Sequence, residues 1–212
     1  MLVARLVLGP LETNCWVVGD DASGPVVVID PADDARDVLD VVGERAIAAI
    51  VLTHRHFDHL GGVRDLMAAS HAPLLVHVDD ASGVSDPQTT GGTAFGFPQT
   101  APVPDRELED GDTIEAGTLR LTVLHTPGHT EGGICLFVLD PCGGAPHLFA
   151  GDTLFAGSVG RTDFPGGDPR ALSTSIATKL APLPAETIVH PGHGPDTTIG
   201  RERRINPFFP RA

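Results

Sequence analysis

Three histidines and one aspartate lie within six consecutive positions of the chain, at His54, His56, Asp58 and His59. This is a dense cluster of metal-binding groups for a sequence that contains 10 histidines in 212 residues. Imidazole nitrogens and carboxylate oxygens together suit zinc, iron or manganese better than calcium or copper(I). The stretch therefore predicts a metal site, and a metal ion in such a site can activate water at neutral pH.

Three further ligand-type residues lie far from this cluster in the sequence, at His129, Asp152 and His193. Each follows an apolar run and is surrounded by glycine or proline, as expected where the backbone must pass close to a bound ion. A single residue of this kind is more often a hydrogen-bonded structural group. Together with the first cluster they supply seven ligands, which is the number that two ions need if one carboxylate bridges them.

The elements that would position these ligands are strands separated by helices. The apolar run 48–52 predicts a buried strand that ends at the first cluster, and ligands collect at the carboxyl ends of strands in α/β proteins. We expect other strands over 2–8, 15–18, 26–29, 74–78, 113–115, 118–124, 134–139, 147–150 and 188–189, and helices that end near residues 42, 69 and 180. The first three strands would form an antiparallel meander, and the whole pattern predicts an α/β fold with a mixed sheet.

Residues 82–105 differ from the rest because they are rich in Gly, Pro, Thr and Ser and include Phe95 and Phe97. A segment of this length without a clear period is either disordered or a functional loop. We interpret it as a flap over the site. The second half of the chain completes the ligand set of the first, so residues 1–212 are expected to form a single domain.

Composition limits the classes of partner. Charged residues make up 20% and hydrophobic residues 41%, as in soluble globular proteins, and the formal net charge is −14. That charge argues against nucleic acid, which needs clustered Lys and Arg, and more weakly against an anionic membrane surface. The expected partner is a small molecule, and the sequence leaves the oligomeric state open.

Cysteine usage and hydropathy favour a cytoplasmic location. Cys15, Cys135 and Cys142 are odd in number and lack C-x-x-C spacing, which fits a reducing compartment better than a disulfide framework. The N-terminal residues lack the continuous apolar core of a secretory signal, and no stretch approaches the roughly 18 apolar residues of a membrane span.

The run from His54 to His59 has the form H-x-H-x-D-H, and this motif resembles the signature of the metallo-β-lactamase superfamily. The other ligand positions also occur in that family's order. The resemblance implies an αββα sandwich that binds two divalent metal ions. Zinc is the expected metal, and iron and manganese are the alternatives. It further implies that His54, His56 and His129 hold one ion, that Asp58, His59 and His193 hold the second, and that Asp152 bridges them.

Within that superfamily the chain looks like a short glyoxalase II-like hydrolase. The stretches that carry this likeness are 13–15, 58–62, 151–155, 160–168 and 206–208. The resemblance implies cleavage of a thioester such as S-lactoylglutathione or a related acyl-thiol by a metal-bridging hydroxide. Asp58 would be the catalytic residue that orients the hydroxide as well as a ligand.

The chain also departs from that branch, because it has no tyrosine, whereas the family uses tyrosines and a lysine to bind glutathione. Arg161 stands where that lysine would be and could pair with a substrate carboxylate. Its structural alternative is to fix its own loop through Asp163 or Asp168. His125 and His190 each precede a ligand closely, and either could support one.

Two other functions remain open at this point. Persulfide dioxygenases of the same superfamily share the stretch 160–164 and use one iron, which here would be held by His54, His129 and Asp152. The residues that follow, 165–168, favour the hydrolase. The second alternative is a non-catalytic metal-binding protein. This function explains the sequence poorly, because the set of seven ligands is complete.

Overall fold

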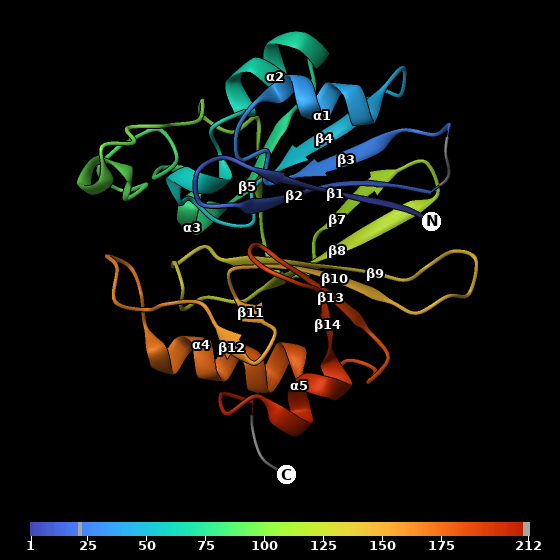
Figure 1. Cartoon of the computed structure of the whole chain (residues 1–212), viewed down its shortest axis with the longest axis vertical. Helices are drawn as coiled ribbons and strands as arrows, with labels where there is room; N and C mark the ends of the chain where they lie inside the picture. Colours follow the sequence, from blue (N-terminus) through green and yellow to red (C-terminus); the bar gives the residue numbers. More distant parts are fainter. Residues whose placement is uncertain (21–22, 210–212) are drawn as a thin grey trace.

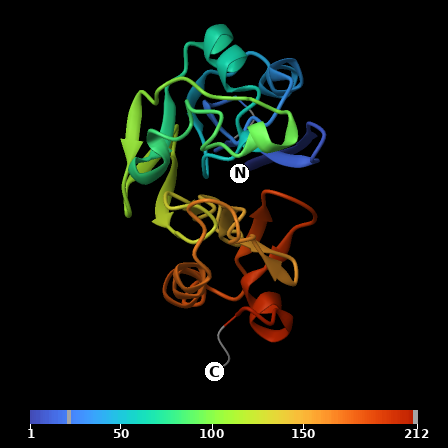
Figure 2. The same cartoon turned by 90° about the vertical axis from the view of Figure 1, so that its left-hand side faces the viewer.

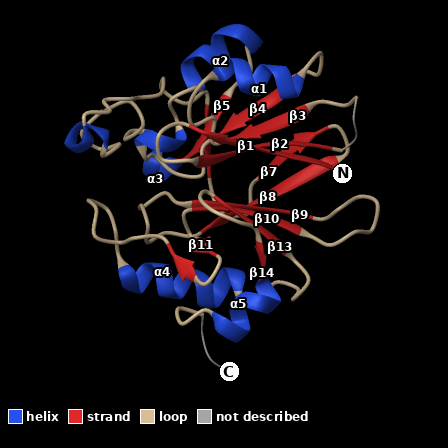
Figure 3. Cartoon of the chain, viewed as in Figure 1, coloured by secondary structure: helices blue, strands red, loops and turns tan. Residues whose placement is uncertain are grey.

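Two six-stranded mixed sheets face each other, and helices cover their outer faces (Figures 1 and 3). The computed structural model describes residues 1–20 and 23–209. The strand order is β1-β2-β3-β4-β5-β6 in the first sheet and β14-β13-β10-β9-β8-β7 in the second. The predicted αββα sandwich is confirmed.

The first sheet begins as the expected antiparallel meander and continues with parallel strands. Its strands are β1 (Leu2–Leu8), β2 (Thr13–Gly19), β3 (Val26–Ile29), β4 (Ile47–Val51), β5 (Leu74–His77) and β6 (Arg106–Leu108). The strand pairs from β3 onward are parallel. The helices of this half are α1 (Ala35–Val42), α2 (Val63–Ser70) and α3 (Val78–Ala81), of which α1 and α2 cover the outer face (Figure 1).

The second half repeats this plan of a meander followed by a parallel strand. Its strands are β7 (Thr113–Ala116), β8 (Leu119–His125), β9 (Ile134–Val138), β10 (His147–Gly151), β13 (Ile188–Pro191) and β14 (Thr197–Thr198). A small hairpin of β11 (Leu154–Phe155) and β12 (Ser158–Val159) follows β10. Helix α4 (Pro169–Ser175) continues as a π-helical turn to Leu180, and α5 (Ile199–Ile205) follows β14.

Alternating apolar residues supply two cores at once. On β2, Cys15 and Val17 face the helices, while Trp16 and Val18 face the second sheet. This follows from the two-residue period of a strand, which sends successive side chains to opposite faces. A third core lies between the second sheet and α4 and α5. Across the described residues, no helix combines the length and apolar character needed to cross a membrane.

Strand direction brings the predicted ligands to one edge of the sandwich. Strands β8 and β10 both run antiparallel to β9, and β13 runs parallel to β10, so the carboxyl ends of β8, β10 and β13 emerge together. The loop after β4 meets this edge, because the Ile134 N–H donates to the Thr53 carbonyl at 2.8 Å. Figure 2 shows this edge, where the first half (blue to green) faces the second half (yellow to red).

Candidate metal centre

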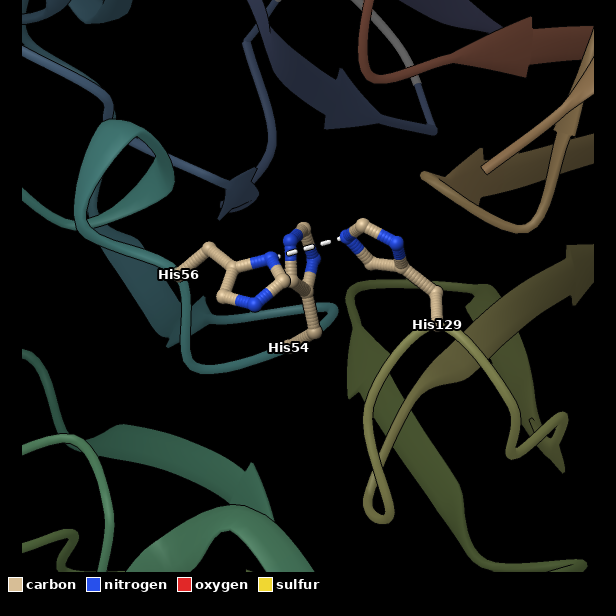
Figure 4. A group of neighbouring side chains, drawn as sticks. All are labelled: His54, His56 and His129. Atoms are coloured by element: carbon tan, nitrogen blue, oxygen red, sulfur yellow. Dashed lines mark hydrogen bonds between the residues drawn. The ribbon is translucent and has the colours of Figure 1, made fainter. Parts of the chain in front are cut away.

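Three histidine rings from two loops converge at this edge (Figure 4). His54 and His56 lie on the loop after β4, and His129 lies on the loop after β8. One nitrogen atom from each ring lies within 4.8 Å of those of the other two. His56 Nδ1 and His129 Nε2 are only 2.8 Å apart, and all three rings are buried.

The environment of these rings favours neutral imidazoles. Burial, followed by the neighbouring His59 and His129, lowers the pKa of His54 well below its ordinary value. Burial and the adjacent His129 lower the pKa of His56 to about 3. A neutral imidazole keeps a lone pair for a metal ion, whereas an imidazolium has none. Both rings are therefore in the protonation state that metal binding requires.

Asp58, His59 and His193 form a second group beside the first. His193 Nε2 lies 3.2 Å from Asp58 Oδ2, and His59 Nε2 lies 3.6 Å from the same oxygen. Burial opposes the charge on Asp58, but the His59 ring and the hydrogen bond with His193 hold the pKa of this carboxyl below its ordinary value. Asp58 and the neighbouring carboxylates outweigh burial and raise the pKa of His59 and His193, so the group offers one ionised carboxylate and two rings that would release protons when an ion binds.

Asp152, at the carboxyl end of β10, faces both groups. Its Oδ2 atom lies 3.6 Å from His129 Nε2 in the first group and 3.6 Å from His193 Nε2 in the second. Its Oδ1 atom lies 3.4 Å from His59 Nε2. All seven predicted ligands are therefore brought together, and Asp152 has the position expected of a bridge.

The residues present fit two divalent cations. Within the described part of the chain, His54 Nε2 is buried without a hydrogen-bond partner, and His59 Nε2 and Asp152 Oδ1, also buried, have no hydrogen-bond partner besides each other, at 3.4 Å. Buried polar atoms are nearly always partnered, so orphaned lone pairs that converge on one place indicate a missing cation. A set of imidazoles with carboxylates suits zinc, iron or manganese.

Asp30 orients two of the histidines, and the sequence analysis missed it. Its Oδ2 atom pairs with His59 Nδ1 at 2.9 Å and accepts a hydrogen bond from Thr53 Oγ1 at 2.7 Å. Thr53 Oγ1 in turn lies 3.0 Å from His54 Nδ1. Engaging Nδ1 fixes each ring and leaves Nε2 for an ion. The sequence feature that could have indicated Asp30 is an acidic residue directly after a buried strand, β3, which is the neighbour of β4 in the sheet.

A buried ion pair joins the loops that carry the first three histidines. Arg55, between His54 and His56, contacts Asp80 of α3 through its guanidinium, and its backbone N–H donates to Asp80 Oδ2 at 3.0 Å. Asp80 also accepts from Thr130 Oγ1 at 2.7 Å, beside His129. This pair was not predicted from the sequence, and it holds the two ligand loops in a fixed relation.

His125 and His190, which could have supported a metal ligand, make their hydrogen bonds to other groups. His125 Nε2 pairs with the Glu131 carbonyl at 2.9 Å. His190 pairs with His147 at 2.8 Å and with Asp196 at 3.1 Å. The supports of His129 and His193 are instead the backbone carbonyls of Arg161 and Leu11.

Gly192 gives a direct steric test of the centre. A Cβ atom at this position would collide with Asp152 Oδ1 and would lie 2.8 Å from His59 Cε1. We expect Gly192→Ala to lower bound metal, measured by mass spectrometry, and to lower hydrolysis roughly 100-fold, because small displacements of reacting groups have effects of that size. Gly143→Ala, in an exposed turn far from the centre, is the control, because a Cβ there meets nothing within 4 Å and its φ of 80° adds a backbone strain that Gly192→Ala does not carry. Full metal content in Gly192→Ala would contradict the assignment.

A cavity of about 370 Å³ opens next to the centre. Its lining residues are Leu11, His56, Phe57, Asp58, Phe95, Phe97, His129, Asp152, Arg161, Phe164 and His193. The Arg161 guanidinium bonds both oxygens of Asp163 at 2.7 Å, and its Cζ lies 3.7 Å from the centre of the Phe164 ring. The structural alternative for Arg161, pairing with Asp163, is thus present in the molecule.

The chain belongs to the metallo-beta-lactamase superfamily, whose family model matches residues 8–193. Among curated relatives, it is 34% identical to the "Hydroxyacylglutathione hydrolase GloC" of Haemophilus influenzae, covering 93% of each chain.

Two solved structures are similar in both fold and sequence. The "BLEG-1 B3 metallo-beta-lactamase" has a TM-score of 0.90 and 37% identity, with 98% of this chain and 99% of that one covered. "TTHA1623 in a di-iron-bound form" has a TM-score of 0.80 and 40% identity, with 98% of this chain and 100% of that one covered.

Proposed function

We propose that this chain is a binuclear metal-dependent hydrolase of the glyoxalase II type that cleaves the thioester of an acyl-thiol. The observation that carries the proposal is the position of Asp152, which lies 3.6 Å from a histidine nitrogen of each group. The ions would be zinc, with iron or manganese as alternatives. Two such ions would polarise the thioester carbonyl and lower the pKa of a water molecule bound to them to about 7.

The residues of the chain have separate tasks in this proposal. The five histidines would hold the ions, and Asp152, which faces both groups, would be shared between them. Asp58 lines the cavity and is ionised, so it can accept a hydrogen bond from the attacking water and direct its lone pair at the carbonyl. The Thr13 hydroxyl donates to Asp58 Oδ2 at 3.3 Å, which leaves the second oxygen of this carboxylate for that purpose.

The relatives support this class of reaction and define the rivals. Family membership supports a metal-dependent hydrolase, and the name of the Haemophilus relative supports an acyl-glutathione substrate. The likeness to the BLEG-1 metallo-beta-lactamase adds β-lactams as compounds to test. A second candidate, a mononuclear iron persulfide dioxygenase, is favoured by the proximity of His129 and Asp152. The second group around Asp58 has no part in that reaction.

Metal analysis and substrate assays on one purified sample test the proposal. We expect two ions per chain and release of thiol from S-lactoylglutathione or another acyl-thiol. One iron per chain with oxygen uptake on glutathione persulfide would support the dioxygenase instead. Hydrolysis of a chromogenic cephalosporin without thioester turnover would assign the chain to β-lactam chemistry, and the absence of all activity and of stoichiometric metal would favour a non-catalytic protein.

Removal of the ions should destabilise the fold. Asp30, Asp58 and Asp152 converge with side chains only 1%, 13% and 12% exposed, and buried carboxylates without a counter-charge are costly. Ions at about 100 times their Kd contribute about 2.7 kcal/mol each, so chelation should lower Tm by roughly 10 °C or more. Differential scanning fluorimetry measures this, and re-addition of zinc should reverse it. An unchanged Tm in a sample shown to be metal-free would contradict the prediction.

A further inference from the structure

Four phenylalanine rings form one wall of the cavity beside the metal centre. Phe57 stacks on Phe97 with ring centres 5.8 Å apart and on Phe95 with ring centres 6.0 Å apart. Phe95 lies 6.0 Å from Phe164, whose ring in turn meets the edge of His56 at 5.7 Å. We call Phe57, Phe95, Phe97 and Phe164 the aromatic wall, and it runs without interruption to a predicted ligand.

The aromatic wall is held by the backbone of three segments. The Phe57 N–H donates to the Thr90 carbonyl at 3.0 Å, and the Phe97 N–H donates to the Gly92 carbonyl at 2.9 Å. The first hydrogen bond fixes the flap segment 82–105 against the metal-binding loop, and the second closes a turn within the flap that places Phe97. Arg55 Nη2 donates to the Pro165 carbonyl at 3.2 Å, next to Phe164. The wall is therefore a built part of the site.

One ring of the aromatic wall remains open to solvent. Phe95 is 54% exposed and Phe57 is 6% exposed, so part of the wall is available to a ligand in the cavity. Exposed contiguous apolar surface at the mouth of a cavity is typical of a ligand-binding site. Aromatic faces bind other aromatic rings by offset stacking or edge contacts.

Apart from the metal centre, the side chains that line the cavity offer little positive charge to an anionic substrate group. Arg161 is the one Lys or Arg among the residues that line the cavity. Its Nε and Nη2 groups both donate hydrogen bonds to the Asp163 carboxylate. These hydrogen bonds lower the pKa of the Asp163 carboxyl to about 2, so the pair is neutral as a unit. A glutathione carboxylate that approached Arg161 would also lie close to the negative charge of Asp163, which offsets its attraction to the guanidinium.

We infer that the cavity selects acyl-thiols that carry an uncharged aromatic group next to the thioester, on either the acyl or the thiol side. In this inference the Arg161 guanidinium packs on the Phe164 ring of the aromatic wall and does not bind a substrate carboxylate. This inference rests on the proposed function for the identity of the reacting bond. The selectivity itself follows from the aromatic wall and the neutral pair.

Four thioesters separate the possibilities. The reference is the lactoyl ester of N-acetylcysteamine, which has neither charge nor ring; the others are its phenylacetyl analogue, the lactoyl ester of benzyl thiol, and S-lactoylglutathione. After correction for alkaline reactivity, we expect kcat/KM for at least one aromatic ester to exceed the reference at least 10-fold, through a lower KM. S-lactoylglutathione should not exceed the reference. The reverse order would overturn the inference, as would equal values for all four.

Failure of the proposed function is recognised separately. If none of the four esters is hydrolysed by metal-loaded protein, the reaction class is wrong. The aromatic preference is then decided by binding alone, with thioethers in which a methylene replaces the carbonyl. Calorimetry should show at least 10-fold tighter binding of the benzyl thioether than of the S-alkylglutathione analogue, and equal or reversed affinities would overturn the inference.

Two pairs of variants test the residues named. Phe95→Ala should reduce the ratio of kcat/KM for the aromatic ester to that for the reference ester at least fivefold. Phe208→Ala is the matched control, because Phe208 is 53% exposed and does not line this cavity. Retention of the preference in Phe95→Ala would contradict the role of the aromatic wall.

The second pair concerns the charge at the cavity. Asp163→Asn should free the guanidinium and raise kcat/KM for S-lactoylglutathione at least threefold relative to the reference ester. Arg161→Met, which keeps an apolar chain over Phe164, should change both esters equally. A selective 10-fold loss on S-lactoylglutathione in Arg161→Met would show instead that Arg161 binds a substrate carboxylate.

Discussion

Replacement of Asp58 by alanine is expected to lower kcat for thioester hydrolysis by about 10³-fold, within the range for loss of a group that acts on the attacking water. Asp58 lies 3.2 Å from His193 and lines the cavity, so the change removes both a ligand and the acceptor that orients water. Stopped assays of thiol release measure the rate, and mass spectrometry measures the metal content.

The companion variants of Asp58 divide its two tasks. Asp58→Asn keeps the shape and loses the charge, and Asp65→Ala removes an exposed carboxylate of α2 as a control. If Asp58→Asn keeps two ions per chain and still loses activity, orientation of water is the main task. Turnover that stays at the original rate in Asp58→Ala would refute the proposed role altogether.

The largest loss of stability is expected from Asp80→Ala. The Asp80 side chain is 0% exposed, Arg55 is 7% exposed, and Asp80 also accepts from the Gly132 N–H at 3.0 Å. Asp80→Ala removes the buried counter-charge of Arg55 and leaves the exposed Glu131; the loss of one partner of a buried pair costs about 3–5 kcal/mol and should lower Tm by roughly 10 °C. Glu131→Ala is the control, because that partner of Arg55 is 60% exposed and exposed pairs contribute about 0–1 kcal/mol.

A double-mutant cycle tests whether Arg55 and Asp80 act as a unit. The variant that combines Arg55→Met with Asp80→Leu should be less destabilised than the sum of the two single changes, by at least about 1 kcal/mol. Metal affinity should fall in each single variant, since the pair links the loops of His54 and His129. Additive effects on the free energy of unfolding, with unchanged metal affinity, would show that the pair does not position the ligands.

The strands and the order of the layers were predictable because the signals are local. The apolar runs 26–29 and 48–52 correspond to β3 (Val26–Ile29) and β4 (Ile47–Val51), and Asp168 caps α4 through its carboxylate with Pro169 in the first turn, which are common signals of a helix start. The seven ligands were found because each follows a strand, and strand ends gather at one edge. The family resemblance implied that Asp152 lies between the two groups, and the direction of the strands gives the physical reason for that position.

The residues that were missed depend on partners distant in sequence. Asp80 follows Asp79, and such an acidic pair is typical of an exposed turn. Its partners Arg55 and Thr130 come close to it only in the folded chain. Asp30 adopts a positive φ of 51°, which no local pattern predicts for an aspartate. The contact of Phe95 and Phe97 with Phe57 joins two segments without a shared period, so the aromatic wall could not be inferred from the sequence.

The ligand groups have one more consequence, which concerns how the molecule comes apart. Each group draws side chains from both halves of the chain, His54 and His56 with His129 in one, and Asp58 and His59 with His193 in the other. A bound ion therefore joins the two sheets in the way that a cross-link does, and neither half can open without breaking bonds to it. Resistance to proteolysis in the metal-loaded protein is then a property of the whole sandwich, gained or lost in one step.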